Sequence, residues 1–160
     1  MRFPSLRPVH AVLLSLLMLV PQFAVAKARS GDVAKLRQCV ENYSRGAPQS
    51  RANGGCVGIV GSACGGETTL AISECLQRET AAWDTLLNEW WTPLRAKAKA
   101  DGSWNRLLAA QRKWIKDRDA ECRRVYDEAG GGSIRVIWAA ECMRDLTAKR
   151  AIEFFYMLYR

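Results

Sequence analysis

Six cysteines constrain the fold of this chain more than any other feature of its sequence. An even number of cysteines in a short chain that reaches an oxidising compartment predicts a framework of disulfides. No two of them stand in a Cys-x-x-Cys motif, so thiol oxidoreductase chemistry has little support. The six are Cys39, Cys56, Cys64, Cys75, Cys122 and Cys142.

The N-terminus predicts how the chain reaches such a compartment. Arg2 and Arg7 precede the apolar run AVLLSLLMLV at residues 11–20, and small residues follow at 24–26. This order is typical of a secretory signal peptide cleaved after residue 26. The run is shorter than the ~20 residues that a membrane-spanning helix needs, and we expect no integral membrane segment after cleavage. We therefore predict a periplasmic or secreted protein that begins near Lys27.

Charge and histidine content narrow the possible functions. The sequence has 24 Lys and Arg against 16 Asp and Glu, a net charge of +8, and removal of Arg2 and Arg7 leaves +6. This balance favours anionic surroundings, whereas an exported protein seldom meets nucleic acid. The only histidine is His10, in the signal peptide, which excludes imidazole-based triads and the usual zinc sites. We expect a protein that is not an enzyme and has no cofactor or metal.

Beyond the signal peptide, helical periodicity alternates with glycine-rich turns, and no alternating strand pattern is present. This predicts an all-α fold, a disulfide-stabilised antiparallel helical bundle of three main helices plus a short N-terminal helix. Segment 46–66 has too much Gly and Pro to be regular. The expected helices are 32–44, 68–100 with a kink at Pro93, 104–129 and 134–158. The expected divisions are a cleaved signal peptide at 1–26, a short helix and Gly-rich disulfide loop at 27–66, and a helical domain at 67–160.

The third expected helix has polar side chains on its apolar face. Projection at about 100° per residue places Gln111, Trp114 and Arg118 on that face and basic residues on the opposite one. A buried arginine without a partner costs several kcal/mol, so it needs carboxylates or carbonyls from neighbouring helices. We place Asp84 nearest to Arg118 or Arg150. The predicted polar network, which fixes the register of the helices, consists of Asp84, Asn88, Gln111, Trp114, Arg118, Thr147 and Arg150.

Three segments together resemble a known family. LLAAQRKWIKDRDAEC is followed by a Gly-Gly-Ser turn and ECMRDLTAKRAIEF, and ECLQRETAAWDTLLNEWW precedes them. In this order they are similar to the LprI-type lysozyme inhibitor N-terminal domain family, a bacterial domain long described as of unknown function. The resemblance spans about residues 73–158 and implies the family's fold. The matched positions are Cys75, Asp84, Leu87, Asn88, Ala110, Gln111, Trp114, Arg118, Asp119, Cys122, Gly131, Gly132, Ser133, Cys142, Leu146, Thr147 and Arg150.

The resemblance implies a cell-envelope protein that inhibits lysozyme or another cell-wall hydrolase by protein–protein binding. Common lysozymes are strongly basic, so a charge of +6 repels them unless an acidic patch faces the enzyme. Glu67, Glu74 and Glu79 are candidates for such a patch. The alternative is a periplasmic binding or scaffolding domain for an anionic cell-envelope polymer. The basic face of the third helix and the run RAKAKA at residues 95–100 suit that ligand.

The expected helices also restrict the disulfides. Cys122 and Cys142 flank the Gly-Gly-Ser turn on adjacent antiparallel helices, and closing this segment stabilises by roughly 3 kcal/mol in the chain-entropy model. Among the other four cysteines, exchange of partners is also geometrically possible. The other expected pairs are Cys56–Cys64 and Cys39–Cys75.

Overall fold

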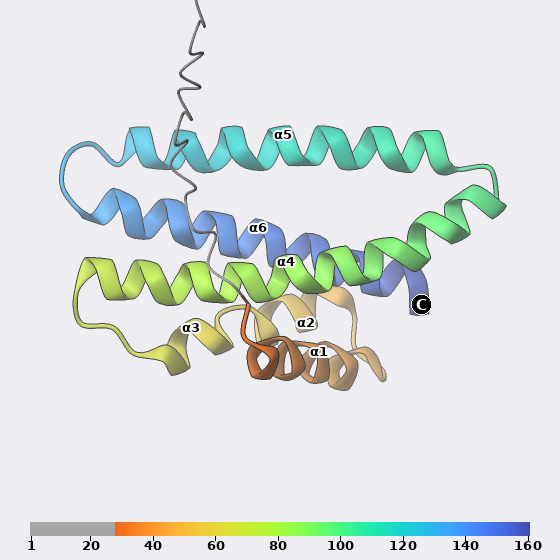
Figure 1. Cartoon of the computed structure of the whole chain (residues 1–160), viewed down its shortest axis with the longest axis horizontal. Coiled ribbons are helices and arrows are strands. Elements are labelled where there is room, and N and C mark those ends of the chain that lie inside the picture. Colours follow the sequence, from red (N-terminus) through yellow and green to blue (C-terminus); the bar gives the residue numbers. More distant parts are fainter. Residues whose placement is uncertain (1–27) are drawn as a thin grey trace, which may run out of the picture.

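The computed structural model describes residues 28–160, and the predicted signal peptide at 1–26 lies outside them. Within the described range all regular structure is helical, which confirms the expected all-α fold (Figure 1). None of these helices has the length and apolar character needed to cross a membrane. The helices are α1 (Ser30–Ser44), α2 (Gln49–Cys56), α3 (Ile59–Cys64), α4 (Thr69–Ala100), α5 (Trp104–Glu128) and α6 (Ile134–Tyr159).

The three long helices form an antiparallel bundle with uneven contacts. α4 packs along α6, whereas α5 packs mainly on α6 and makes few contacts with α4. α4 bends toward the start of α5 over its last turns (Figure 1), and Pro93 lies inside this helix, where its ring removes one backbone hydrogen bond. The α4–α5 turn contains Gly102 at φ 76°, in the left-handed region that favours glycine. The bundle is therefore closed between α4 and α6 and more open between α4 and α5.

The hydrophobic core lies where α4 and α6 meet the N-terminal helices. Leu36 of α1, Trp83 of α4 and Phe154 of α6 have no exposed surface. Trp90 is also buried, and its ring meets Phe155 edge-on at a centroid distance of 5.1 Å. Full burial of one large apolar side chain contributes about 2–3 kcal/mol. These tryptophans therefore serve the core and do not form an exposed binding surface.

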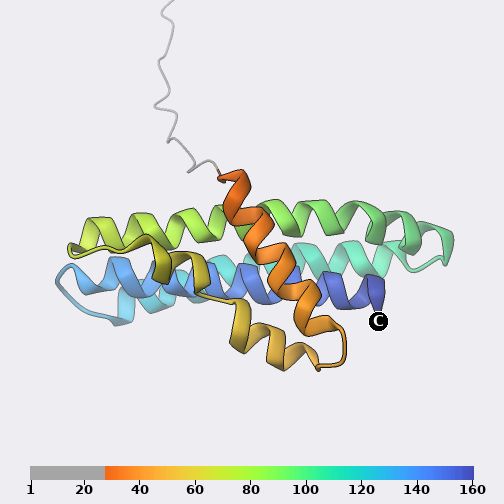
Figure 2. The same ribbon diagram turned by 90° about the horizontal axis from the view of Figure 1, so that it is seen from below.

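The Gly-rich segment at 46–66, which we expected to be irregular, contains the two short helices α2 and α3. They have eight and six residues, and helices of this length are marginal in water on their own. Figure 2 shows them beside α1, on the side of the bundle away from α5. The expectation was wrong because glycine lowers helix propensity by only about 1 kcal/mol per residue, which tertiary contacts can offset.

Two disulfides differ from the expected pairs. The structure joins Cys39 to Cys56 and Cys64 to Cys75, in place of Cys56–Cys64 and Cys39–Cys75. The Cα–Cα distances of 5.8 and 5.7 Å lie in the usual range. The physical reason is the presence of α2 and α3. Cys56 ends α2, which packs on α1, whereas Cys64 ends α3, which packs on α4.

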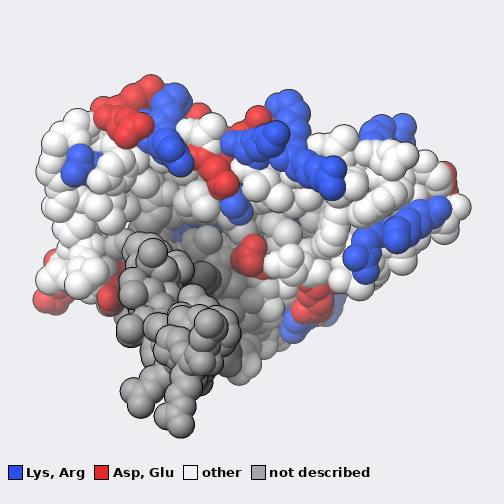
Figure 3. Space-filling view, turned by 45° about the horizontal axis from the view of Figure 1, so that its top comes forward, with Lys and Arg blue, Asp and Glu red and all other residues white. Residues whose placement is uncertain are grey.

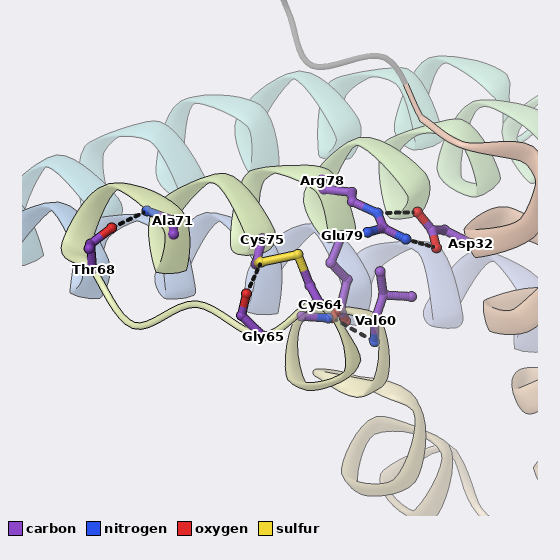
Figure 4. Close-up of a disulfide and its surroundings, with 10 residues drawn as sticks. Asp32, Val60, Cys64, Gly65, Thr68, Ala71, Cys75, Arg78 and Glu79 are labelled. Carbon is purple, nitrogen blue, oxygen red and sulfur yellow. Dashed lines mark hydrogen bonds and ion pairs between the residues drawn. A yellow bond between two sulfur atoms is a disulfide. The ribbon is translucent and has the colours of Figure 1, made fainter.

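A buried carboxylate holds α3 against α4. Glu79 has no exposed surface, so it is not part of the acidic patch for which we considered it. It accepts hydrogen bonds from the backbone N–H groups of Gly58 and Gly61, each at 2.6 Å, and of Val60 at 3.1 Å. The indole N–H of Trp83 donates a fourth at 3.0 Å. Figure 4 shows this carboxylate at the start of α3, where it satisfies N–H groups that a short helix leaves without partners.

A bidentate ion pair fastens α1 to α4. Arg78 donates from Nε and Nη2 to the two carboxylate oxygens of Asp32 at 2.6 and 2.7 Å (Figure 4). These hydrogen bonds and the guanidinium charge lower the pKa of Asp32 below its ordinary value. Core residues of α1 and α2 also pack with those of α4 and α6. The division expected between 27–66 and 67–160 stays a prediction.

Candidate functional site

A groove of about 680 Å³ opens between α4 and α5, in the half of the bundle next to the α5–α6 turn. Its lining comes from residues 73–85 of α4, 118–126 of α5 and 136–147 of α6, together with Ala28. Because α6 contacts both other helices and α4 hardly touches α5, α6 forms the floor and the other two helices form the walls. Two other hollows among residues 28–160 are smaller, at about 230 and 340 Å³.

Short side chains keep the groove open. The third disulfide, Cys122–Cys142, holds α5 on α6 with a Cα–Cα distance of 5.4 Å, and it is the pair expected from the sequence. α4 and α6 present Ala81, Ala139 and Ala140 to the space in between. Packed helices normally interdigitate longer side chains across interaxial distances of about 8–10 Å. Methyl groups from the α4 wall and from the α6 floor do not fill the gap, so the space stays open to a ligand.

The floor of the groove contains an unsatisfied hydroxyl. Thr147 has no exposed surface, and its Oγ1 has no hydrogen-bond partner among residues 28–160. The neighbouring buried hydroxyl of Ser73 differs, because it accepts a hydrogen bond from Gln77 Nε2 at 3.0 Å. Leaving a buried polar group unpaired costs about 1–3 kcal/mol. The floor of the groove therefore contains a polar atom that the fold does not satisfy.

Asp84 and Arg118 line the groove from opposite walls. Arg118, one of the two arginines that we placed nearest to Asp84, instead donates to Asp119 Oδ1 from Nε and Nη2 at 2.9 and 2.8 Å. Its guanidinium lies 5.0 Å from the ring centroid of Trp114. Asp84 accepts a hydrogen bond from Asn88 Nδ2 at 3.1 Å. Because α4 and α5 are splayed apart at this level, each charged group takes a partner on its own helix.

Arg150 connects α6 to α5. Its Nε donates to Gln111 Oε1 at 2.9 Å, and its Nη1 donates to Glu153 Oε2 at 2.7 Å. The same guanidinium lies 4.6 Å from the ring centroid of Phe154 and 5.7 Å from that of Trp114. Cation–π contacts at these distances add to the two hydrogen bonds and hold the arginine in place.

The structure thus divides the predicted polar network into three parts. One part is a cluster between α5 and α6, the second is a pair on α4, and the third is the floor of the groove. The role of these residues in fixing helix register stays a prediction. The three parts are Gln111 with Trp114, Arg118 and Arg150; Asp84 with Asn88; and Thr147.

The net charge is concentrated at the other end of the bundle. Residues 92–116 hold seven Lys or Arg side chains and a single acid, Asp101, for a net charge of +6. Residues 28–91 have a net charge of −1 and residues 117–160 have none. Figure 3 shows Lys and Arg side chains gathered toward the end where α4 meets α5. We call residues 92–116 the basic tip.

The end of the bundle beside the groove has a different surface. Leu70 and Trp138 are 69% and 47% exposed, values high for large apolar side chains. Thr69 Oγ1 donates to Ser133 Oγ at 3.2 Å, which joins the start of α4 to the α5–α6 turn. Several carboxylates at this end make no ion pair with any residue in the range 28–160. We call the following set the groove end: Glu67, Leu70, Glu74, Asp127, Ile134, Val136, Trp138 and Glu141.

The groove was not part of the sequence-based predictions, whereas the run at 95–100 and the basic face of the third helix already indicated much of the basic tip. The net charge summed over a window of 25 residues identifies the basic tip from the sequence alone. No sequence pattern predicts the groove, because the groove depends on how α5 packs on α6 relative to α4. Within residues 28–160, no group of His, Cys, Asp and Glu side chains is arranged to hold a metal ion.

Comparison with known proteins adds two findings. The family model described as "Lysozyme inhibitor LprI" matches residues 61–154, more than half of the chain. An uncharacterized protein of Rhizobium meliloti (strain 1021) is 40% identical over 52 residues, a match that spans 32% of this chain and 37% of that protein. No solved structure matches the chain significantly.

Proposed function

Because the chain belongs to the LprI lysozyme inhibitor family, we propose that it binds and inhibits lysozyme outside the cytoplasm. The observation that carries this proposal is the family match over residues 61–154, a range that includes nearly all residues lining the groove. An inhibitor of this kind needs a complementary surface and no catalytic group. The three disulfides suit an oxidising compartment.

We propose the groove end as the surface that contacts the enzyme. Protein interfaces combine a buried core of apolar and aromatic side chains with a polar rim. Trp138, Leu70 and Val136 supply exposed apolar surface at this end of the bundle. The groove beside them adds a concave space with the Thr147 hydroxyl at its floor. A protruding loop of the enzyme would complement that space.

The distribution of charge supports the same end. α5 has 25 residues and is therefore about 37 Å long, so the turn at the centre of the basic tip is far from the groove end. The Debye length is about 8 Å at physiological salt, and the charge of the tip is largely screened over that distance. At the groove end Glu74, Asp127 and Glu141 are exposed carboxylates. A basic lysozyme would meet these acids first, which removes the repulsion expected from the net charge.

The direct test is an inhibition assay with the purified protein lacking residues 1–26. Lysozymes of several classes are assayed at low and at moderate salt. We expect saturable inhibition of at least one class, with only a modest loss at moderate salt because a packed apolar contact is little affected by screening. Absence of inhibition of every class at both salt concentrations would reject the proposal.

A matched pair of variants tests the surface. Trp138→Ala removes an exposed aromatic side chain from the groove end, and we expect it to raise the inhibition constant by at least about tenfold, as interface tryptophans commonly do. Tyr159→Ala is the control, since Tyr159 is a 61% exposed aromatic residue near the opposite end of the same helix. If the two variants weaken inhibition equally, the groove end is not the contact surface.

A further inference from the structure

The basic tip contains cations that the fold does not use. Four of them are exposed and form neither an ion pair nor a cation–π contact with any residue from 28 to 160, whereas Lys99 lies over the ring of Trp104. Like charges on neighbouring turns repel one another, so this concentration works against folding unless an anionic partner lies opposite it. The four are Arg95, Arg106, Arg112 and Lys116.

The acidic groups near the tip do not neutralise it. Asp101, its only acid, accepts hydrogen bonds from the backbone N–H and the hydroxyl of Ser103 at 3.0 and 2.5 Å and closes the α4–α5 turn. Lys97 approaches the same carboxylate at 3.5 Å. Lys113 pairs with Asp117, which lies just beyond the tip, at 2.6 Å. Most of the positive charge therefore faces solvent.

The tip also offers apolar surface among its cations. A hollow of about 230 Å³ lies between α4, α5 and the end of α6. Leu94 and Leu107, which are largely buried, form its base, and Met157 contributes the exposed apolar side chain. Lys97, Arg106 and the acid Asp101 line the same hollow. Met157 is 46% exposed. Cations and apolar groups thus occupy one surface.

We propose that the basic tip binds the surface of a membrane rich in anionic phospholipids. Lipid phosphates complement the cations, and each Lys or Arg near such a surface raises partitioning about fivefold. Exposed apolar and aromatic side chains favour the interfacial layer, and Met157 with Tyr159 supplies them near the tip. A soluble anionic polymer would engage the charges and leave the apolar hollow unused. The proposal does not depend on lysozyme inhibition.

Sedimentation with vesicles tests the proposal. The protein lacking residues 1–26 is mixed with vesicles of phosphatidylcholine alone or of phosphatidylcholine with phosphatidylglycerol, at low and at moderate salt. We expect binding only to the vesicles that contain phosphatidylglycerol, and a steep loss as salt rises. Polyphosphate serves as the soluble polyanion. Equal binding to both vesicle types, or binding to polyphosphate without binding to anionic vesicles, would overturn the proposal.

A quadruple variant locates the binding surface. The substitutions Arg95→Gln, Arg106→Gln, Arg112→Gln and Lys116→Gln remove four exposed charges from the tip, and glutamine keeps good helix propensity. We expect the partition coefficient on anionic vesicles to fall at least about tenfold. The double variant Arg112→Gln/Lys116→Gln is expected to show an intermediate loss, and it provides the test if the quadruple variant fails to fold.

The control removes the same total charge from elsewhere. Arg45→Gln, Arg51→Gln, Arg123→Gln and Lys149→Gln change four exposed cations outside the tip that form no ion pair within residues 28–160. We expect this variant to lose less than about threefold in partitioning, because its charges lie farther from the bound surface. Equal losses in the two quadruple variants would show that net charge alone governs binding, and the basic tip would then not be the site.

Discussion

The N-terminal helices and the α5–α6 hairpin are both closed by disulfides, yet they differ in how their polar groups are used. Around α1–α3, two disulfides cross-link the helices. The buried polar atoms there have partners in the Arg78–Asp32 ion pair and in four hydrogen bonds to Glu79. The Asn53 Oδ1 atom is the one buried exception there among the described side chains. The hairpin has one disulfide, and beside it the Thr147 hydroxyl is unpaired in an open groove.

The N-terminal helices therefore maintain the shape of the molecule, whereas the α5–α6 hairpin offers a surface. Short glycine-rich helices have little stability of their own, so covalent bonds and a buried carboxylate must hold them. Long helices hold each other by packing and can leave part of a face uncovered. A contact surface is therefore expected on the hairpin, and sensitivity to single substitutions is expected near Glu79. The following variants test this contrast.

The largest effect is expected from Glu79→Ala. The change leaves three buried or half-buried backbone N–H groups and an indole N–H without their acceptor, and we expect the free energy of unfolding to fall by about 3–5 kcal/mol. Urea unfolding at neutral pH measures it. Glu74→Ala, on the exposed side of the same helix, should change stability by less than about 0.5 kcal/mol. A loss below about 1 kcal/mol for Glu79→Ala would contradict the structural role of this carboxylate.

Removal of a disulfide should have a similar cost in both regions and different local consequences. The bridged residues are 17 apart for Cys39–Cys56 and 20 apart for Cys122–Cys142, and each double alanine variant should lose about 3 kcal/mol. Hydrogen exchange should show loss of protection in α1 and α2 for the first variant. The second variant should keep protected amides along α5 and α6. Matching exchange patterns in the two variants would argue against the contrast.

Thr147→Val should have a smaller effect of opposite sign. Replacing an unpaired buried hydroxyl by a methyl group of similar shape removes a desolvation cost, so we expect stability to stay equal or to rise by about 1 kcal/mol. Thr80→Val is the matched control, because the Thr80 hydroxyl also lines the groove but donates to Leu76 O at 2.8 Å. Chemical denaturation of both variants measures the difference. A loss above about 1 kcal/mol for Thr147→Val would show that its hydroxyl has a partner.

The smallest effect concerns pH and Asp32. Arg78 lowers the pKa of this carboxyl in the folded protein, so the stability it contributes is present above the unfolded pKa of about 3.9 and is lost as pH falls through the lower folded value. Asp32→Asn should therefore be less stable than the parent at neutral pH and converge with it in strong acid. Thermal unfolding across this range is the measurement. A constant difference down to strong acid would contradict the assignment, and Asp117→Asn, which breaks an exposed pair, is the control.

The long helices could be predicted from the sequence because their signals are local. Apolar periodicity and glycine turns placed the third helix at 104–129, and α5 spans Trp104–Glu128. The α5–α6 disulfide followed from the same logic, since two helices joined by a short turn bring Cys122 and Cys142 side by side. Charge and apolar periodicity are properties of residues close together in the sequence, so both can be recognised without knowledge of the fold.

The N-terminal pairings and the groove could not be predicted in this way because they depend on distant contacts. The acceptor that stabilises the start of α3 is Glu79, 18 to 21 residues farther along the chain. No local rule for helix propensity includes such a partner, so segment 46–66 was expected to be irregular. The expected pairing of Asp84 with Arg118 or Arg150 was wrong for a related reason, since helical projection gives the face of each helix and not the spacing between helices.

The position of Glu79 also has a consequence for oxidative folding. Cys56 and Cys64 are only eight residues apart, so in a chain whose α3 has not yet docked they are near neighbours and prone to bond with each other. The hydrogen bonds between α3 and Glu79 hold Cys64 beside Cys75, its native partner. A Cys56–Cys64 bond would have to be exchanged before that pair can form. Docking on Glu79 therefore favours the native pairing.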